Sequence, residues 1–552
     1  MYIIKKFFNI ILYELFKKTT PSRKSNAMSR SILKQSSKIG FFALISRFIA
    51  FIREWLLIQF LSVGDTSDIF FTAFRIPNTM RKIFAEGALS SILVPAFINA
   101  QHKEGQKGLH KLTTGALVII ETIIFAICVT VFCLSTNVIA TIAPGFSPEK
   151  VERTAYYLKI LMSFILFISS GAIFASALQS QRKFFIPAIA PSILNVVYVA
   201  SLCICLYFQL SVTVFCYFMI MTSIVFLLLH LVAYFKQGYT LDRPDQQTSK
   251  EMRTIIFQLI PCIVSVGITE INHFINTGFA SYLTSGSMTL LRSSFQFVNI
   301  PVGIITASLV TVLLPHFSKL HLEQPKDLVD HLFEAIKFII WTTMPICFLL
   351  YLFSQHIFET LFMGDAQALS KIHLAQSIFT AYLVGLLSFS LNKIFLSIFY
   401  ALRLTIIPMI ASIIAIGINY FLNQELIQNY GAAGIALASS IAAISQTLFL
   451  TIFLSKYLHL NWSASKWFDF FARYLVQLTL CCTVLWTLYN AGYFLIGSLN
   501  FNINLHVITV SQQTFLHGFG VWFWAGPLSL GYLGLLYVTR KYFKISLTYF
   551  DH

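Results

Sequence analysis

Charged residues are scarce in this chain of 552 residues. Lys, Arg, Asp and Glu make up 11% of it, hydrophobic residues make up 57%, and the mean hydropathy is +0.75. Since soluble globular domains contain about 25% charged residues, this composition excludes an ordinary soluble protein. No polar block of domain length separates the apolar runs that recur from Ile39 to Val538. The sequence therefore predicts an all-α polytopic membrane protein.

Acidic residues are the scarcer of the charged ones, because 22 Asp and Glu stand against 39 Lys and Arg and leave a net charge of +17. The basic residues fall in alternate connections between apolar runs, and the intervening connections hold only Lys150, Arg153 and Lys371. Basic residues concentrate on the cytoplasmic side of membrane proteins. This alternation predicts fourteen spans with both termini in the cytoplasm, and it explains the net charge without a nucleic-acid partner.

The predicted spans cover residues 39–62, 67–98, 113–141, 155–178, 185–206, 213–235, 254–281, 289–315, 333–354, 375–399, 405–422, 432–455, 467–489 and 518–539. Residues 1–38 form a cytoplasmic segment before them. Its first part, Met1 to Lys18, alternates apolar and basic residues. Two interpretations stay open for this part: an amphipathic helix at the membrane surface, or a misassigned start with translation beginning at Met28.

Motifs for metal binding and nucleotide chemistry are missing. The nine Cys residues lie in or at the ends of apolar segments and lack the spacing of metal ligands. There is no glycine-rich phosphate loop with its Lys, and no set of acid, base and nucleophile. We therefore expect neither an enzyme nor an ATPase, and no cofactor.

Ionisable residues are nevertheless concentrated in the first two predicted spans. They are Arg47, Arg53, Glu54, Asp68, Arg75, Arg81, Lys82 and Glu86. Each such group costs about 2.5 to 3.5 kcal/mol at the bilayer centre, so five cations facing lipid would cost about 12 to 18 kcal/mol. These spans are therefore expected to line a water-accessible cavity. Because three acids offset only three of the five cations, the cavity keeps an excess of positive charge.

Two interpretations of these charges remain open. Seven residues return a helical side chain to nearly the same direction, so Arg47 shares a face with Glu54, and Asp68 shares one with Arg75. In the first interpretation, cations and acids pair and only fix helix packing. In the second, the guanidinium groups bind a phosphate-bearing anion through bidentate hydrogen bonds. Four of the five cations are Arg, which favours a diphosphate-linked substrate.

Further polar residues lie deep in later spans. Arg292 and Lys393 either extend the cationic wall or form structural ion pairs. Glu121 is expected either to bind a neighbouring helix or to be a partly neutral buried acid. A weak candidate set for Na⁺ or for proton coupling consists of Glu270, Asn272, Asn276, Asn419 and Asn423. Hydrogen bonding between helices is the favoured interpretation of that set.

Prolines inside the predicted spans indicate bent helices. A proline frees a backbone carbonyl, which is tolerated in a membrane only where protein or water satisfies it. The prolines concerned are Pro77, Pro261, Pro301 and Pro408. In addition, the segments 94–97 and 314–317 share the pattern apolar, Pro, any residue, Phe. This weak similarity indicates a repeat of six helices, as in many secondary carriers.

Several motifs at these positions are specific. They are Ser46-Arg47 with Arg53-Glu54, the run DIFFTAFRIPN from Asp68 to Asn78, the run RKIFAEGA from Arg81 to Ala88, and Val94-Pro95. Weaker motifs are Ala143-Pro144-Gly145-Phe146, Ser285-Gly286-Ser287 and the run GIALA from Gly434 to Ala438. With these motifs the chain resembles the MurJ/MviN family of lipid II flippases, in the multidrug/oligosaccharidyl-lipid/polysaccharide exporter superfamily. The resemblance extends from Ser29 to the C-terminus.

This resemblance implies a fold of fourteen transmembrane helices, in two six-helix lobes plus two C-terminal helices around a V-shaped central cavity. On the predicted spans, the lobes cover residues 39–235 and 254–455, helices 13 and 14 cover 467–539, and 540–552 form a cytoplasmic tail. It also implies export of the peptidoglycan precursor lipid II across the bacterial inner membrane by alternating access. Lipid II and membrane lipids are then the partners, and we expect a monomer.

The positions at which the family binds its substrate can be matched residue by residue. The implied substrate-binding residues are Ser46, Arg47, Arg53, Asp68, Asn78, Arg81, Glu86 and Lys393. The implied hinge or gate positions are Pro77, Gly87 and Pro301.

The sequence departs from the family pattern in the eighth span. Gln296 stands where the family has a cavity arginine, and Phe295 and Asn299 replace its acidic neighbours. Arg292 lies one helical turn from Gln296. We therefore expect Arg292 to supply the missing positive charge and to bind substrate.

Rival functions differ in the substrate they require. One is a flippase for another polyprenyl-diphosphate-linked saccharide, and another is a non-transporting relative. A drug or cation antiporter is disfavoured, because arginines repel a cationic substrate. Na⁺, protons and the membrane potential all stay open as energy sources, and the potential alone is worth about 2.3 kcal/mol per charge per 100 mV.

Overall fold

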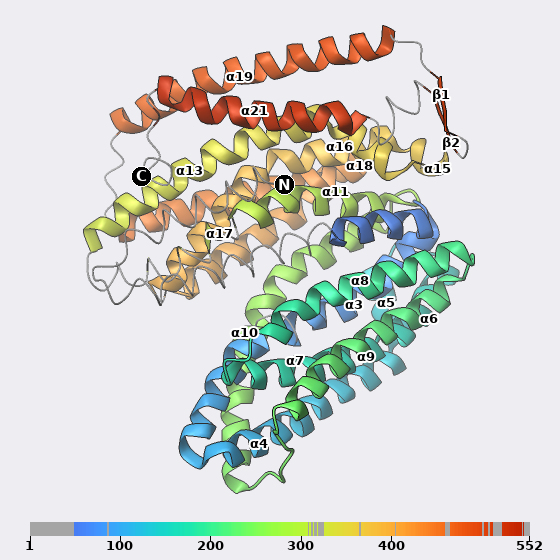
Figure 1. Cartoon of the computed structure of the whole chain (residues 1–552), viewed down its shortest axis with the longest axis vertical. Coiled ribbons are helices and arrows are strands. Elements are labelled where there is room, and N and C mark those ends of the chain that lie inside the picture. Colours follow the sequence, from blue (N-terminus) through green and yellow to red (C-terminus); the bar gives the residue numbers. More distant parts are fainter. Residues whose placement is uncertain are drawn as a thin grey trace. The chain divides into compact units, whose positions relative to one another are not determined.

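The computed structural model describes residues 49–84, 88–306, 309–310, 313, 317, 325–363, 366–402, 404–458, 464–498, 502–505, 508–511, 521–543 and 545. Nearly all of them are helical (Figure 1). The chain divides into two compact units, and the boundary between Thr289 and Leu290 falls inside helix α11. The predicted helical fold is confirmed.

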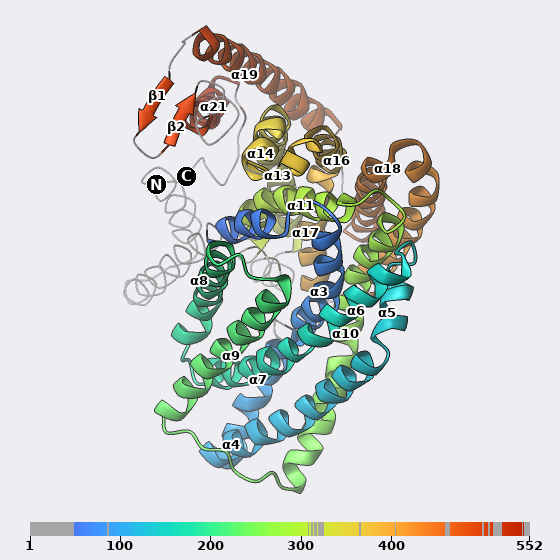
Figure 2. The same cartoon turned by 90° about the vertical axis from the view of Figure 1, so that its right-hand side faces the viewer.

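The first unit is a bundle of long helices. Residues 49–61 are helical, and they are followed by α3 (Asp65–Phe84), α4 (Ala88–Cys133), α5 (Ser135–Ile142), α6 (Pro148–Leu161), α7 (Ser163–Ser180), α8 (Phe185–Tyr207), α9 (Val212–Lys236) and α10 (Gln246–Ala280). Helix α7 packs between α4 and α9, α8 packs on α9, and α3 packs on α6. Helix α10 packs along α4 and α3, so it belongs to this unit (Figure 2).

The second unit begins within α11 (Ser287–Pro301) and continues through the π-helical turn η1 (Val302–Thr306). Its other elements are α13 (Pro325–Leu352), α14 (Ser354–Leu361), α15 (Ala366–Leu369), α16 (Ile372–Val384), α17 (Leu386–Ala401), α18 (Ile406–Tyr457), α19 (Ala464–Ser498), β1 (Asn502–Leu505), β2 (Ile508–Ser511) and α21 (Trp522–Tyr542). Strands β1 and β2 form an antiparallel hairpin that the sequence did not lead us to expect. Helices α19 and α21 pack side by side (Figure 1).

Seven helical stretches of the described residues are long and apolar enough to cross a membrane, or eight if the bent pair α16 and α17 counts as one span. Two stretches each cover most of two predicted spans, namely Asp65–Cys133 and Ile406–Tyr457. The predicted spans 39–62, 67–98, 289–315 and 518–539 lie partly outside the described residues. The multi-spanning character is therefore confirmed, whereas the number fourteen and the lobe boundaries stay predictions.

Glycine pairs make the corners that divide two of these long stretches. Gly105 in α4 and Gly431 in α18 have φ angles of 64° and 55°, which favour glycine. Three residues later, Gly108 and Gly434 lie so close to the preceding helix that a Cβ atom would clash with the carbonyl oxygen eight residues earlier. Both corners fall in connections that the sequence predicted, between spans two and three and between spans eleven and twelve.

The prolines act differently in different helices. Pro77 lies inside α3, which continues as one helix to Phe84. Pro301 ends α11 and is followed by the π-helical turn, so the regular α-helix is interrupted there, as the proline predicted. Pro408 lies in the first turn of α18, where a missing N–H costs nothing, so the predicted break at Pro408 is wrong.

A short repeat of structure appears in both units. In the first, α4 ends at Cys133 and the eight-residue helix α5 follows after one residue. In the second, α13 ends at Leu352 and the eight-residue helix α14 follows after one residue. These short helices begin about 220 residues apart, which is also the spacing of the two sequence segments with the shared Pro and Phe. The agreement supports the six-helix repeat.

Buried polar contacts fasten α14 to the two C-terminal helices. His356 of α14 is 3% exposed, and its ring nitrogens lie 3.0 Å from Glu359 Oε2 and 2.7 Å from the Tyr489 hydroxyl of α19. Trp522 Nε1 of α21 donates to Thr360 Oγ1 at 2.9 Å. Among the described residues, the corresponding helix α5 of the first unit packs on α6 and α10. The contacts with the C-terminal helices therefore distinguish α14 from α5.

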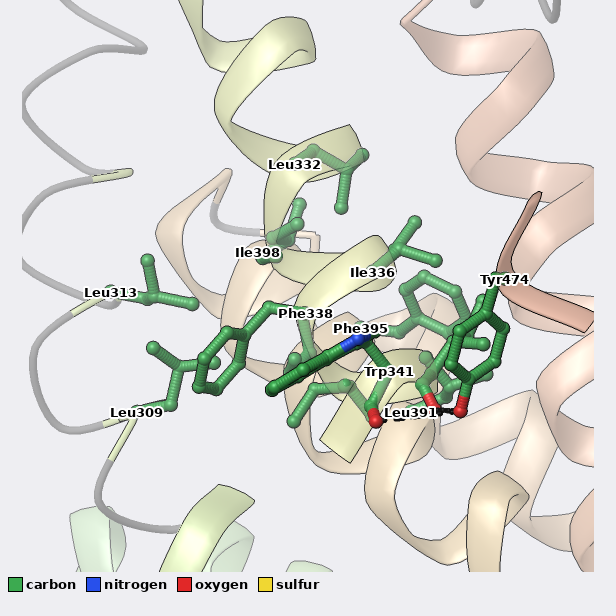
Figure 3. Close-up of a cluster of buried hydrophobic side chains, with 14 of the residues drawn as sticks. Leu309, Leu313, Leu332, Ile336, Phe338, Trp341, Leu391, Phe395, Ile398 and Tyr474 are labelled. Carbon is green, nitrogen blue, oxygen red and sulfur yellow. Dashed lines mark hydrogen bonds between the residues drawn. The ribbon is translucent and has the colours of Figure 1, made fainter. Parts of the chain in front are cut away.

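The core of the second unit forms where α13, α17 and α19 meet (Figure 3). Pro345 in α13 lacks the N–H that the Trp341 carbonyl would otherwise accept. The hydroxyl of Tyr474, on α19, lies 3.4 Å from that oxygen and 3.1 Å from the Ile340 oxygen, and donates there. Tyr474 therefore satisfies backbone that the proline leaves exposed.

Tyr474→Phe removes this donor while it keeps the ring. We expect the variant to lose about 0.5 to 1.5 kcal/mol of stability, the usual worth of a hydrogen bond between membrane helices. Thermal unfolding in detergent measures the loss. The control is Tyr542→Phe, at a side chain that is 82% exposed. Equal unfolding temperatures for both variants would contradict the role assigned to Tyr474.

Candidate functional site

The predicted site residues fall into two groups. Ser46, Arg47, Glu86 and Gly87 lie outside the described residues. The described members are Arg53, Asp68, Asn78, Arg81, Arg292 and Lys393, with Pro77 and Pro301.

Arg53 is held mainly by neutral groups. Its Nη1 donates to Asn195 Oδ1 at 2.9 Å, and its guanidinium carbon lies 5.2 Å from the centre of the Tyr198 ring. Both partners come from α8. The Glu54 carboxylate is 3.9 Å from Nη2, and the Arg53 side chain keeps 28% of its surface exposed. This arrangement fixes the direction of the guanidinium and leaves further N–H donors for a ligand.

Arg81 is oriented by its neighbour on the same helix. Its Nε and Nη2 donate to Asn78 Oδ1 at 3.3 and 3.0 Å. The two residues are three positions apart on α3, where side chains meet on one face. The structure thus brings together two residues that the sequence predicted as substrate ligands.

A second face of α3 binds α10 through polar contacts. Lys82 Nζ lies 2.8 Å from Glu270 Oε1, and Thr79 Oγ1 donates to Glu270 Oε2 at 3.1 Å. Arg75 Nη1 donates to the His273 carbonyl at 2.9 Å. Glu270 therefore serves as the partner of Lys82, and these contacts give no support to its predicted role as a ligand for Na⁺.

Asp68 is buried at 2% exposure and binds the first turn of α11. Its Oδ2 accepts the Gly286 N–H at 2.7 Å, while Oδ1 accepts the Thr289 N–H at 3.0 Å and its hydroxyl at 2.8 Å. Carboxylates are favoured at helix N-termini, where backbone N–H groups lack partners. Asp68 thus fastens the start of α11 to α3.

Residues that sequence reasoning missed complete this contact. Lys150, in the first turn of α6, lies 2.7 Å from Asp65 and 3.8 Å from Asp68. The Gly145 N–H donates to Ser281 Oγ at 2.8 Å, and a Cβ atom at Gly145 would lie 2.6 Å from the backbone of Ser281. Two sequence motifs, around Gly145 and Gly286, marked these segments as notable, but only the fold shows that both lie near Asp68.

Helix α10 is also fixed at its start. Asp245 caps it by accepting the Thr248 N–H at 2.9 Å, and Lys111 Nζ of α4 lies 2.6 Å from its other oxygen. The Lys111 ammonium, together with the cap, holds the pKa of Asp245 well below its usual range. Helix α10 is therefore anchored at its start, near Glu270 and at its end.

The remaining predicted residues are spread over other helices. Arg292 and Gln296 are half-buried on α11, and Lys393 is half-buried on α17. Asn419 is buried and accepts the Ser439 hydroxyl at 3.4 Å, between the two arms of α18. Ser169 donates to Glu121 at 2.7 Å, which confirms the predicted contact of Glu121 with a neighbouring helix.

Metal ligands do not gather within the part of the chain that the structure describes. No group of three or more His, Cys, Asp or Glu side chains there could hold a metal ion. Asn272 and Asn419, the other predicted Na⁺ candidates, are set on α10 and α18. A sodium site at these residues stays a prediction.

Comparison with known proteins decides the family. The family model described as lipid II flippase MurJ matches residues 57–504. The chain belongs to the MurJ lipid II flippase family. Flippases of this family are transporters rather than catalytic enzymes. Family membership and the long apolar helices together indicate a multi-pass protein of the bacterial inner membrane.

Relatives in the family have low sequence identity to this chain, but the matched regions are long. A probable lipid II flippase MurJ of Buchnera aphidicola subsp. Schizaphis graminum is 29% identical over 420 residues, covering 75% of this chain and 81% of its own. The one from Rhizobium meliloti is 28% identical over 436 residues, covering 76% and 80%. The match therefore extends over most of both chains.

Solved structures share the fold. A lipid II flippase MurJ in an inward closed conformation superposes with a TM-score of 0.70 at 23% identity, covering 91% of this chain and 98% of its own. An inward-facing multidrug resistance MATE family transporter reaches 0.62 at 15% identity, covering 74% and 94%. The family resemblance that the sequence motifs indicated is confirmed.

Within this MurJ family member, Asp68→Asn tests the attachment of α11. The amide offers an N–H where the carboxylate accepts, so one buried donor loses its partner, at a cost of about 1 to 3 kcal/mol. The control is Asp65→Asn, three residues earlier, whose side chain is 61% exposed beside Lys150. There we expect a loss within about 1 kcal/mol. Unfolding midpoints in detergent would contradict the attachment if Asp65→Asn were the more damaging change.

Proposed function

We propose that this chain moves lipid II from the inner to the outer leaflet by alternating access, with the diphosphate bound by Arg47, Arg53 and Arg81. Family membership supports the substrate and the reaction. The environment of Arg53 carries the proposal for the site, because its guanidinium is oriented by an amide and an aromatic ring while its side chain stays 28% exposed.

Arginine suits this task for two physical reasons. A guanidinium presents two parallel N–H groups that match two phosphate oxygens, and it stays charged in every environment that a protein offers. A diphosphate in the membrane needs its charge compensated, while the attached lipid tail can stay in the bilayer. Fixed cations in a wet cavity meet that need with little reorganisation.

The architecture implied by this function goes beyond the described helices. We infer fourteen spans with both termini in the cytoplasm, lobes at residues 39–235 and 254–455, and a V-shaped cavity between the lobes. Lipid II and membrane lipids are the partners, the protein acts as a monomer, and no cofactor takes part. Coupling to Na⁺ or protons can be separated from coupling to the membrane potential with selective ionophores.

Arg53→Lys tests the binding of the diphosphate. The lysine keeps the charge but loses the paired N–H groups, so we expect transport to fall about 10- to 100-fold, as for the loss of one charge-assisted hydrogen bond. The measurement is lipid II accumulation on the cytoplasmic leaflet after depletion of the resident flippase. Arg473→Lys is the matched control, since Arg473 pairs with Asp469 at 2.8 Å on exposed α19.

The same depletion experiment separates the rival functions. Accumulation of a different lipid-linked saccharide would identify a flippase for that saccharide. If no lipid-linked precursor accumulates, the chain is a non-transporting relative. Normal transport by Arg53→Lys would contradict the assigned role of Arg53 while leaving lipid II as the substrate.

Arg292 and Gln296 offer a second test of the cationic wall. They lie one turn apart on α11, and both are half-buried. If Arg292 supplies the charge that the family usually places at the position of Gln296, Arg292→Ala impairs transport about tenfold or more. Gln296→Ala should stay near the parent level. If both variants transport equally well in the same assay, Arg292 does not supply the charge that is missing at Gln296.

A further inference from the structure

We propose that Lys82 is a further ligand for the substrate diphosphate. In this reserve role, Lys82 is paired with Glu270 before the substrate binds and exchanges Glu270 for the diphosphate when it does. The inference rests on the proposed function, because it presupposes a phosphate-bearing substrate beside α3. It assigns a role to the ion pair between Lys82 and Glu270, which the proposed site does not use.

Exposure of the two partners is unequal. The Lys82 side chain is 35% exposed, whereas the Glu270 side chain is 9% exposed. Lys82 directly follows Arg81 in the last turn of α3, so both cations leave the helix at the same level. The ammonium is thus accessible from solvent, while the carboxylate that holds it is fixed in the contact with α10.

Glu270 keeps its position without Lys82. Its Oε2 accepts the Thr79 hydroxyl at 3.1 Å, on the oxygen that Lys82 does not use. Independently, Arg75 donates to the His273 carbonyl at 2.9 Å, one helical turn along α10. Two contacts between α3 and α10 therefore remain when the ammonium leaves.

The chemistry of lysine suits such an exchange. An ammonium on a flexible four-carbon stem can change partners by rotation, whereas a guanidinium is suited to one planar geometry. A diphosphate carries more negative charge than a carboxylate and would compete with Glu270 for the ammonium. No bond to carbon or phosphorus forms or breaks, and the proton stays on Lys82.

This exchange makes an unusual prediction about its two partners. If the pair only holds the helices together, removal of either partner weakens the protein in the same way. If Glu270 competes with the substrate, its removal strengthens diphosphate binding, and removal of Lys82 weakens it. Changes in diphosphate affinity of opposite sign for the two removals would therefore show that Glu270 competes with the substrate for Lys82, and does not only hold the helices together.

The experiment measures binding of farnesyl diphosphate to the full chain in nanodiscs. We expect Lys82→Met to weaken binding about threefold to tenfold and Glu270→Gln to strengthen it by a similar factor. Glu270→Asp, which withdraws the carboxylate by one methylene, should act in the same direction as Gln and serves if Gln impairs folding. Lys82→Arg keeps the charge but not the ammonium, so it should restore only part of the binding that Met loses.

A matched pair on neighbouring helices provides the control. Lys103 of α4 lies 2.9 Å from Glu251 of α10, and the Lys103 side chain is 58% exposed. We expect Lys103→Met and Glu251→Gln to leave binding unchanged. Changes of the same sign at Lys82 and Glu270, or no change, would overturn the reserve role alone. Failure of the parent protein to bind farnesyl diphosphate would overturn the diphosphate site and this role with it, whereas the lipid II accumulation assay tests the proposed function separately.

Discussion

Hydrocarbon offers no hydrogen bonds, so every polar group within the bilayer must find a partner in the protein or in water. This constraint explains contacts that look unrelated. Tyr474 donates to backbone that Pro345 leaves without a donor, and Ser169 binds Glu121 between α7 and α4. The helices are therefore joined at particular levels by polar contacts as well as by apolar packing. The position of each charged residue thus indicates where two helices are in contact.

Helix α10 shows what such contacts achieve. In order along the chain it opens the second group of six predicted spans, yet Asp245, Glu270 and Ser281 bind it to other parts of the first unit. Beyond it, Asp68 holds the first turn of α11, and regular α-helix ends at Pro301. The chain thus passes from one unit to the other through a helix that is fixed at its start and interrupted at its end. A π-helical turn there is a natural place for bending.

Sequence reasoning captured what depends on composition and local pattern, and it missed what depends on pairing. Hydropathy predicted the membrane helices, and two predicted connections coincide with the glycine corners at Gly105 and Gly431. The partner of Lys82 lies 188 residues away and the partners of Asp68 lie up to 221 residues away, so no local signal could identify them. Pairing Asp68 with Arg75 on one helical face was reasonable, but the helix N-terminus offered better-placed donors.

The shortest contacts of these cations involve two kinds of partner. Lys150 and Lys82 meet carboxylates, which cancel much of their charge and fix neighbouring helices. Arg53 donates its shortest hydrogen bond to the amide oxygen of Asn195, and Arg81 donates to the amide oxygen of Asn78. An amide sets the direction of a guanidinium without cancelling its charge, because it brings a dipole and no net charge. Direction without neutralisation is what a preorganised anion site requires, since the work of orienting the cation is done before the anion arrives.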